Sequence, residues 1–344
     1  MSLDAGLSAG ADVALGVDIG GTKVLGIALG TSDRILAEAR VPTPGDRRGK
    51  EDAGSRGADA VADAVADVVA QLDAALSPVV ASPRSASPIG VGAPGMVDHQ
   101  GRLRFAPNLP QGQGLDWRRL MGDRLGARPV LIENDANFAV LAEHRLGVAQ
   151  GYRHVMMVTL GTGIGGGLIV DGRVQVGGHG FAGEVGHMVV DPSGPPCPCG
   201  RRGCWERYAS GGGLGMLTRQ AALAGRLPQL VKAAGGDPES VRGEEVSAAA
   251  QDGDPGARRV VEEVGWWVGF GLANLACVFD PECFVLGGGL MSAGDLLLAS
   301  ARAAFAELVE GGDRRPEVAV VAASFGARAG AVGAALAARQ GGLR

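Results

Sequence analysis

The 344-residue chain is poor in lysine and in aromatic side chains. Lysine occurs at Lys23, Lys50 and Lys232, and 37 acidic residues against 32 basic ones give a formal net charge of −5. Aromatic residues make up 4% of the chain. An acidic chain of this kind has no strongly basic surface of the type that binds nucleic acid. We therefore expect small molecules, rather than nucleic acid, as its partners.

Long apolar runs and a secretion signal are also missing. The most apolar stretch, residues 264–279, is uncharged but shorter than the 18 or more residues that suggest a membrane span. Because it contains Gly265, Gly269 and Gly271, we expect a buried helix with closely packed glycine faces. Residues 1–13 show no basic segment followed by an apolar one, so we expect a cytoplasmic protein that does not bind membranes.

Glycine, by contrast, is abundant and points to turns at functional sites. The chain has 59 glycines, more than twice the usual share of about 7%. A strand, a glycine turn and a returning strand are predicted in each half, at residues 13–29 and 155–170. Helical spacing of apolar residues follows these units, as in residues 58–76. The pattern predicts an α/β protein with two related domains that flank a cleft.

We place the domain boundary where a short strand gives way to a helix. The smaller domain is predicted to comprise residues 1–134, completed by the C-terminal helix at 326–344. The larger domain is predicted to comprise residues 135–325. A length of 344 residues agrees with two domains, because single hydrophobic cores rarely grow beyond about 250–300 residues.

The first glycine turn has the composition of a phosphate loop. In residues 18–23, the backbone of Gly20 and Gly21 can approach phosphate oxygens, Thr22 offers a hydroxyl and Lys23 a charge. Asp18 can orient Mg²⁺ or its waters. An ordinary tight hairpin would also explain the glycines.

A second turn of the same kind favours the phosphate interpretation. Gly161, Thr162 and Gly163 stand at the corresponding place of the second half. Two such turns, one in each domain, could hold a polyphosphate tail from both sides.

Asn134 and Asp135 lie where a strand ends and a helix begins, the usual position of ligands in α/β sheets. Both residue types are also common helix N-caps, and the two roles are compatible. Asp135 is a candidate general base for an attacking hydroxyl. We expect the helix terminus to keep the pKa of Asp135 low, so that positioning matters more than basicity.

One histidine and three cysteines form a predicted zinc site. His187 is followed by Cys197, Cys199 and Cys204, with glycine and proline turns between them. Three Cys and one His complete a tetrahedral set with no position left for water, which predicts structural rather than catalytic zinc. The metal would hold Glu184, His187 and Glu206 in place.

Taken together, these motifs resemble those of the ROK family (repressors, open reading frames and sugar kinases), in particular its bacterial glucokinases. The resemblance extends from about residue 15 to residue 339. It rests on DIGGTK at 18–23, GAPGMVD at 92–98, PNLP at 107–110, ENDAN at 133–137, LGTGIGGG at 160–167, GEVGH at 183–187, CPCGRRGCWE at 197–206 and LGGG at 286–289.

The resemblance implies an actin-like ATPase fold of the ribonuclease-H-like type, with ATP and a sugar in the cleft. It implies phosphorylation of glucose at its 6-hydroxyl, with Asp135 as the base, and a homodimer or homotetramer. The sugar-binding residues implied are Gly95, Asn108, Asn134, Asp135, Glu184, His187 and Glu206. The residues implied for Mg²⁺ and the phosphates are Asp18, Gly20, Gly21, Thr22, Lys23, Thr162 and Gly163, and those near adenosine are Gly287, Gly288 and Gly289.

Two alternatives stay open at this point. The first is a kinase for another hexose or an N-acetylhexosamine, or one that uses polyphosphate as donor. The second is a sugar-responsive transcriptional repressor, since that branch of the family shares the sugar domain and the cysteine cluster. Such repressors carry an N-terminal winged helix-turn-helix, for which the 17 residues before Asp18 are too few.

Overall fold

The computed structural model describes residues 13–44, 55–76, 87–107, 109 and 112–343. By their internal contacts, the residues form two compact units. Unit 1 comprises residues 1–157, 167–183 and 323–344, and unit 2 comprises residues 158–166 and 184–322. The predicted boundary after residue 134 differs from this division, which groups residues 135–157 with unit 1.

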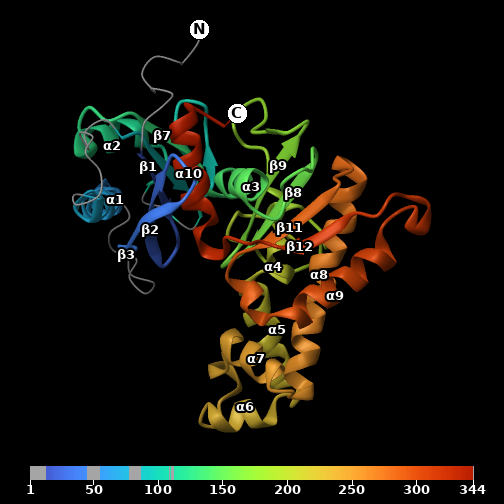
Figure 1. Cartoon of the computed structure of the whole chain (residues 1–344). Coiled ribbons are helices and arrows are strands. Elements are labelled where there is room, and N and C mark those ends of the chain that lie inside the picture. Colours follow the sequence, from blue (N-terminus) through green and yellow to red (C-terminus); the bar gives the residue numbers. More distant parts are fainter. Residues whose placement is uncertain (1–12, 45–54, 77–86, 108, 110–111, 344) are drawn as a thin grey trace. The chain divides into compact units, whose positions relative to one another are not determined.

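A five-stranded sheet forms the centre of unit 1, with the strand order β3-β2-β1-β4-β7 (Figure 1). β1 and β2 are an antiparallel pair joined by the first glycine turn, whereas β4 lies parallel to β1 and β7 parallel to β4. Because helices cover both faces, the central strands are buried apolar runs. The bounds are β1 Val13–Ile19, β2 Lys23–Gly30, β3 Ile35–Pro42, β4 Ile89–Ala93 and β7 Val130–Asn134, with a separate hairpin of β5 Met96–Val97 and β6 Leu103–Phe105.

Two pairs of helices cover this sheet. α1 (Ser55–Leu76) and α2 (Trp117–Leu125) belong to the core on one face, and α3 (Asp135–Leu146) and α10 (Ala329–Gln340) to the core on the other. α10 lies very close to β1 and β4. A Cβ on Gly16 would stand 1.9 Å from the carbonyl oxygen of Ala331, and one on Gly90 2.1 Å from that of Ala334. Part of the glycine excess therefore serves helix-on-sheet packing rather than ligand binding.

The second sheet repeats the order of the first. Its strands are arranged β10-β9-β8-β11-β12, so that the hairpin strands and the two later strands occupy the same places as in β3-β2-β1-β4-β7. The second glycine turn joins β8 to β9, and its Gly161 N–H donates to the Gly163 carbonyl at 2.9 Å. The bounds are β8 Val155–Leu160, β9 Ile164–Val170, β10 Arg173–Val174, β11 Cys283–Gly287 and β12 Ala319–Ala322.

Helices make up most of the rest of unit 2. α8 packs along α9 through the predicted glycine face, because a Cβ on Gly269 would stand 2.5 Å from the Ala301 carbonyl oxygen. The prediction that this helix is buried is wrong for its other face, where Trp266 and Val278 are 38% and 70% exposed. The bounds are α4 Glu206–Ala209, α5 Gly211–Leu223, α6 Pro228–Ala233, α7 Gly243–Gln251, α8 Pro255–Phe279 and α9 Asp295–Leu308. Within the described residues, no helix combines the length and hydropathy needed to cross a bilayer.

Candidate active site and metal centre

The first glycine turn, at the end of β1, is held by a residue that sequence reasoning missed. The Gly20 N–H donates to the Lys23 carbonyl at 3.0 Å, which closes the turn. Thr43, just beyond β3, donates from its hydroxyl to the Gly20 carbonyl at 2.6 Å and from its N–H to the Thr22 carbonyl at 3.1 Å. β3 carried no strong strand signal in the sequence, so nothing pointed to Thr43.

Asp18 and Asp135 come together at the carboxyl ends of β1 and β7. Gly92 lies between them, because a Cβ there would stand 3.4 Å from both Asp18 Oδ1 and the Asp135 Cα. Burial and, after it, the Asp135 carboxyl raise the pKa of Asp18, and Lys23 acts in the opposite direction, so that together they place this pKa at about 8. The two candidate residues from distant parts of the sequence therefore interact electrostatically.

The expectation that the helix terminus keeps the pKa of Asp135 low is wrong in this structure. Burial raises the pKa of Asp135 to about 6, although the Ala136 N–H donates to its Oδ1 at 2.9 Å and acts to lower it. Desolvation of the partly buried carboxyl outweighs the hydrogen bond from the first turn of α3, because burial penalises the charged form. A base with a pKa near 6 is well matched to proton transfer at neutral pH.

The surroundings of Asp18 fit a divalent cation. Asp18 Oδ1 is buried and has no hydrogen-bond partner among the described residues. An unpaired carboxylate oxygen beside a second carboxyl is costly without a counter-charge. Mg²⁺ prefers one or two carboxylates together with water and phosphate oxygens, a set that these residues could supply.

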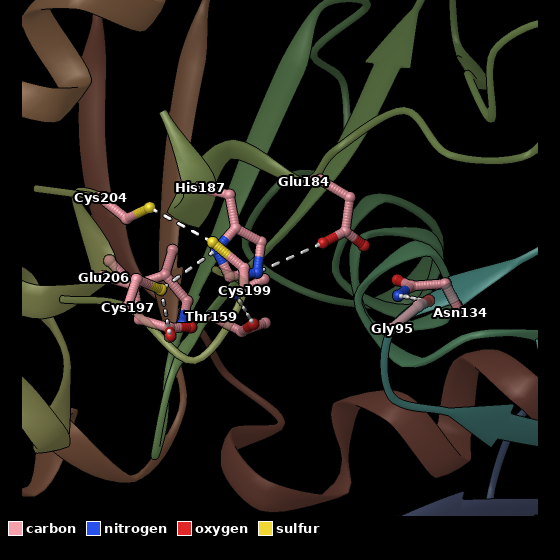
Figure 2. A network of polar contacts seen from close by, with 11 residues as sticks. Gly95, Asn134, Thr159, Glu184, His187, Cys197, Cys199, Cys204 and Glu206 are labelled. Atoms are coloured by element: carbon pink, nitrogen blue, oxygen red, sulfur yellow. Dashed lines mark hydrogen bonds and ion pairs between the residues drawn. The ribbon is translucent and has the colours of Figure 1, made fainter. Parts of the chain in front are cut away.

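Asn134 acts as the N-cap of α3 and contacts Gly95 as well. Its Oδ1 accepts from the N–H groups of Ala136 and Asn137 at 2.9 and 3.2 Å. Its Nδ2 donates to the Gly95 carbonyl at 3.0 Å, the contact drawn in Figure 2. The structure thus brings two predicted sugar ligands together and shows that one of them is also a cap. Asn108, another of the predicted sugar-binding residues, lies outside the described residues.

In unit 2, Glu206 lies against the second glycine turn. Its Oε2 accepts from the Ile164 N–H at 3.0 Å and would stand 2.1 Å from a Cβ on Gly163, so the carboxylate uses the space that a side chain there would fill. Its Oε1 lies 4.0 Å from Cys197 Sγ. Glu206 therefore connects the predicted phosphate turn to the cysteine cluster, a link that spacing alone did not reveal.

The predicted zinc ligands converge on one point (Figure 2). One ligand atom from each of four residues lies within 4.8 Å of the others, namely His187, Cys197, Cys199 and Cys204. Sγ of Cys199 and Sγ of Cys204 are 3.6 Å apart, and Cys197 Sγ is 3.8 Å from His187 Nδ1. Tetrahedral Zn–S bonds of about 2.3 Å place neighbouring sulfurs about 3.8 Å apart. The four residues therefore fit a closed zinc site.

The two ring nitrogens of His187 face different groups, the cysteine cluster and Glu184. Its Nδ1 points to Cys197, while its Nε2 lies 4.0 Å from Glu184 Oε2. Glu184 immediately precedes a short 3₁₀ turn, Val185–His187, and His187 ends it. Zinc on Nδ1 would leave the proton on Nε2, so the metal would set both the tautomer and the orientation of the ring.

The turn after β11 reaches the second glycine turn. Gly288 has a φ of +89°, and a Cβ there would stand 2.5 Å from the carbonyl carbon of Leu160, the residue before Gly161. Gly287, Gly288 and Gly289 therefore lie close to the predicted phosphate turn within unit 2. Unit 1 carries Asp18, the first turn, Gly95, Asn134 and Asp135, and unit 2 carries the remaining described candidates.

The two sheets share one strand order, and each carries a glycine turn in its first hairpin. Comparison with known proteins identifies the family that has this architecture. The chain belongs to the ROK family, which matches residues 14–341. This confirms the predicted actin-like ATPase fold.

More particularly, the chain is similar to glucokinases. It is 38% identical over 333 residues to the glucokinase of Streptomyces coelicolor, which covers 95% of this chain and 97% of that one. The crystal structure of a ROK family glucokinase from Streptomyces griseus, in complex with glucose and AMPPNP, matches with a TM-score of 0.81 and 38% identity, covering 95% of this chain and 99% of that one. A xylose repressor of Bacillus spizizenii is 31% identical over 64% of this chain and 53% of the repressor.

Proposed function

We propose that the protein is an ATP-dependent glucokinase that transfers a phosphoryl group to the 6-hydroxyl of glucose. The observation that carries this proposal is the similarity to glucokinases in sequence and structure over 95% of the chain. The solved relative binds glucose and AMPPNP, which are the substrate and a substrate analogue of this reaction.

The sugar would be bound by polar side chains and one glycine. The residues that we assign to it are Gly95, Asn108, Asn134, Asp135, Glu184, His187 and Glu206. Acceptors and donors of this kind can hydrogen-bond the hydroxyls of a polyol and leave an unsuitable sugar with unpaired groups. Zinc at His187, Cys197, Cys199 and Cys204 would be structural and would keep His187 and Glu206 in position.

Asp135 would act as the general base. Its carboxylate is the group whose raised pKa, caused by burial, suits it to accept the proton of the attacking hydroxyl. In phosphoryl transfer the proton leaves late, so holding the hydroxyl in line with the phosphate contributes more than strong basicity. Exclusion of water would prevent the competing hydrolysis of ATP.

The phosphates would be held by the two glycine turns. The first turn would contribute Gly20, Gly21, Thr22 and Lys23, and the second Thr162 and Gly163. The residues that would lie by the adenosine are Gly287, Gly288 and Gly289. Bound Mg²⁺ would supply positive charge that offsets the charge of the phosphates. Asp18 would orient this cation, as its unpaired Oδ1 suggests.

A coupled assay of ADP release over a panel of sugars and phosphate donors tests the proposal. Glucose with MgATP should give the highest kcat/KM, and mass spectrometry should find glucose 6-phosphate. Asp135→Ala should reduce kcat by several orders of magnitude while glucose still binds. A preference for mannose, fructose or N-acetylhexosamines, or for polyphosphate as the donor, would instead support the alternative kinases. An unchanged kcat in Asp135→Ala would exclude Asp135 as the base.

The similarity to a xylose repressor keeps one second candidate in view, a sugar-responsive repressor. Gel-shift assays with genomic fragments, with and without sugar, separate the two functions. We expect no shifted DNA band.

We also propose that the protein is a homodimer or homotetramer that works in the cytoplasm. Light scattering after size-exclusion chromatography measures the mass of the oligomer.

A further inference from the structure

Arg207 follows Glu206 in α4 and lies beside the second glycine turn. Its Nη1 is 3.8 Å from the point where a Cβ on Gly212 would stand, and the Thr162 carbonyl oxygen is 3.2 Å from the same point. The guanidinium and the predicted phosphate residue Thr162 therefore approach the same small volume. All of these residues belong to unit 2.

The backbone holds this arrangement together. At the start of α5, the Gly211 N–H donates to the Gly161 carbonyl at 2.8 Å and the Gly212 N–H to the Thr162 carbonyl at 3.3 Å. Ser210, the N-cap of α5, donates from its hydroxyl to the Glu206 carbonyl at 2.6 Å. The chain just after Arg207 is thus bonded directly to the glycine turn, and Ser210 closes the short segment back onto Glu206.

The guanidinium of Arg207 lacks an acceptor within the described part of the chain. Its Nε is buried without a hydrogen-bond partner, and the structure gives its side chain no ion pair. The adjacent Glu206 is engaged elsewhere, at the Ile164 N–H and Cys197. An always-charged group with a buried, unsatisfied N–H is costly, which indicates that an acceptor binds there in the working protein.

We propose that Arg207 binds the phosphate chain of the donor nucleotide beside the second glycine turn. The planar fork of a guanidinium matches phosphate oxygens and can hold two of them at once. Its positive charge would also offset the nearby Glu206 carboxylate, which by itself would repel the donor. This assignment rests on the proposed kinase function and adds a donor-binding residue to it.

The test compares Arg207→Gln and Arg207→Lys with wild type. Losing a charge-assisted hydrogen bond to phosphate costs about 1.5–3 kcal/mol, so Arg207→Gln should raise KM for MgATP by about 10- to 100-fold. KM for glucose should stay within about twofold, and Arg207→Lys should recover part of the loss because it keeps the charge. Arg219→Gln is the matched control, since Arg219 is an exposed arginine further along α5.

Direct binding and stability measurements separate this role from a merely structural one. Titration calorimetry with AMPPNP and with inorganic tripolyphosphate should show weaker binding of both to Arg207→Gln, while the melting temperature without ligand stays at the wild-type value. An unchanged KM for MgATP, an equal change in Arg219→Gln, or a parallel loss of stability and glucose affinity would overturn the proposal. So would an effect confined to polyphosphate. If wild type phosphorylates no sugar, the kinase function fails; if wild type is active and Arg207→Gln matches it, only this inference fails.

Discussion

The carboxylate of Glu206 occupies the position where a side chain at Gly163 would begin, with Oε2 2.1 Å from the notional Cβ. The same oxygen accepts from the Ile164 N–H. Gly163→Ala must therefore displace Glu206 or distort the turn, and both groups belong to the proposed substrate site. We expect KM for glucose and for MgATP to rise by about tenfold or more, because each lost charged hydrogen bond costs about 1.5–3 kcal/mol.

Steady-state kinetics with each substrate varied in turn measures this effect. Gly215→Ala is the matched control, because a Cβ there would stand 3.8 Å from the nearest atom, the end of a flexible arginine, within helix α5. It should retain wild-type kinetics. Wild-type KM values for Gly163→Ala would show that the Glu206 position is unimportant for either substrate.

The raised pKa of Asp135 predicts an acid limb in the pH profile. The base works when ionised, so kcat/KM for glucose should be present above pH about 6 and fall about tenfold per pH unit below it. An aspartate with its ordinary pKa, near 3.8, would place the limb about two pH units lower. The profile is measured at saturating MgATP, with activity re-assayed at pH 7.5 after each incubation to confirm that the fold survives. A limb near pH 4 would contradict the inferred burial.

Removing zinc should lower stability and sugar affinity together. Cys199→Ser removes one ligand, and zinc content by elemental mass spectrometry should fall from about one ion per chain. The melting temperature should drop, and KM for glucose should rise about 10- to 100-fold, because His187 and Glu206 lose their support. Cys277→Ser is the control, since Cys277 is an exposed thiol on α8, and it should change none of these values. A chelator that removes zinc without lowering the melting temperature would refute a structural role.

Glu143 is expected to be among the most sensitive positions for stability. It is fully buried, with Oε2 accepting from the Ser324 hydroxyl at 2.8 Å and the Val148 N–H at 3.2 Å, and Oε1 accepting from the Phe325 N–H at 2.8 Å. Glu143→Gln turns a donor amide toward these donors. We expect a loss of about 3 kcal/mol in the free energy of unfolding.

Urea unfolding measures this loss, with exposed Glu317→Gln as the control expected to stay within about 0.5 kcal/mol of wild type. Equal unfolding free energies for the two variants would mean that the buried contacts of Glu143 contribute nothing net.

The position of Glu143 also explains why residue 147, at the end of α3, is a glycine. The backbone there is extended and not left-handed as a C′ glycine would be, but a Cβ would stand 2.1 Å from Glu143 Oε2.

Several elements could be predicted because their signals are local in the sequence. The hairpins around Gly20–Gly21 and Gly161–Gly163 follow from apolar runs with turn residues between them. α5 has a weak local helix signal, because its opening run Gly211–Gly213 consists of residues with low helix propensity. Its glycines are required by close approach to the chain of α4 and the second glycine turn, which only the folded structure brings near.

By itself, the sequence determined which chemical groups are available and which of them lie close together along the chain. The histidine and cysteines fall within 18 residues, and each glycine turn is a single short segment, so their spacing restricts the geometry. The tertiary structure decided the partners and protonation of the remaining groups. Glu143 meets Ser324 across 181 residues, and Asp135 acquires its raised pKa from burial beside the sheet. Desolvation and long-range contact depend on what packs around a group, and that is settled only when distant segments fold together.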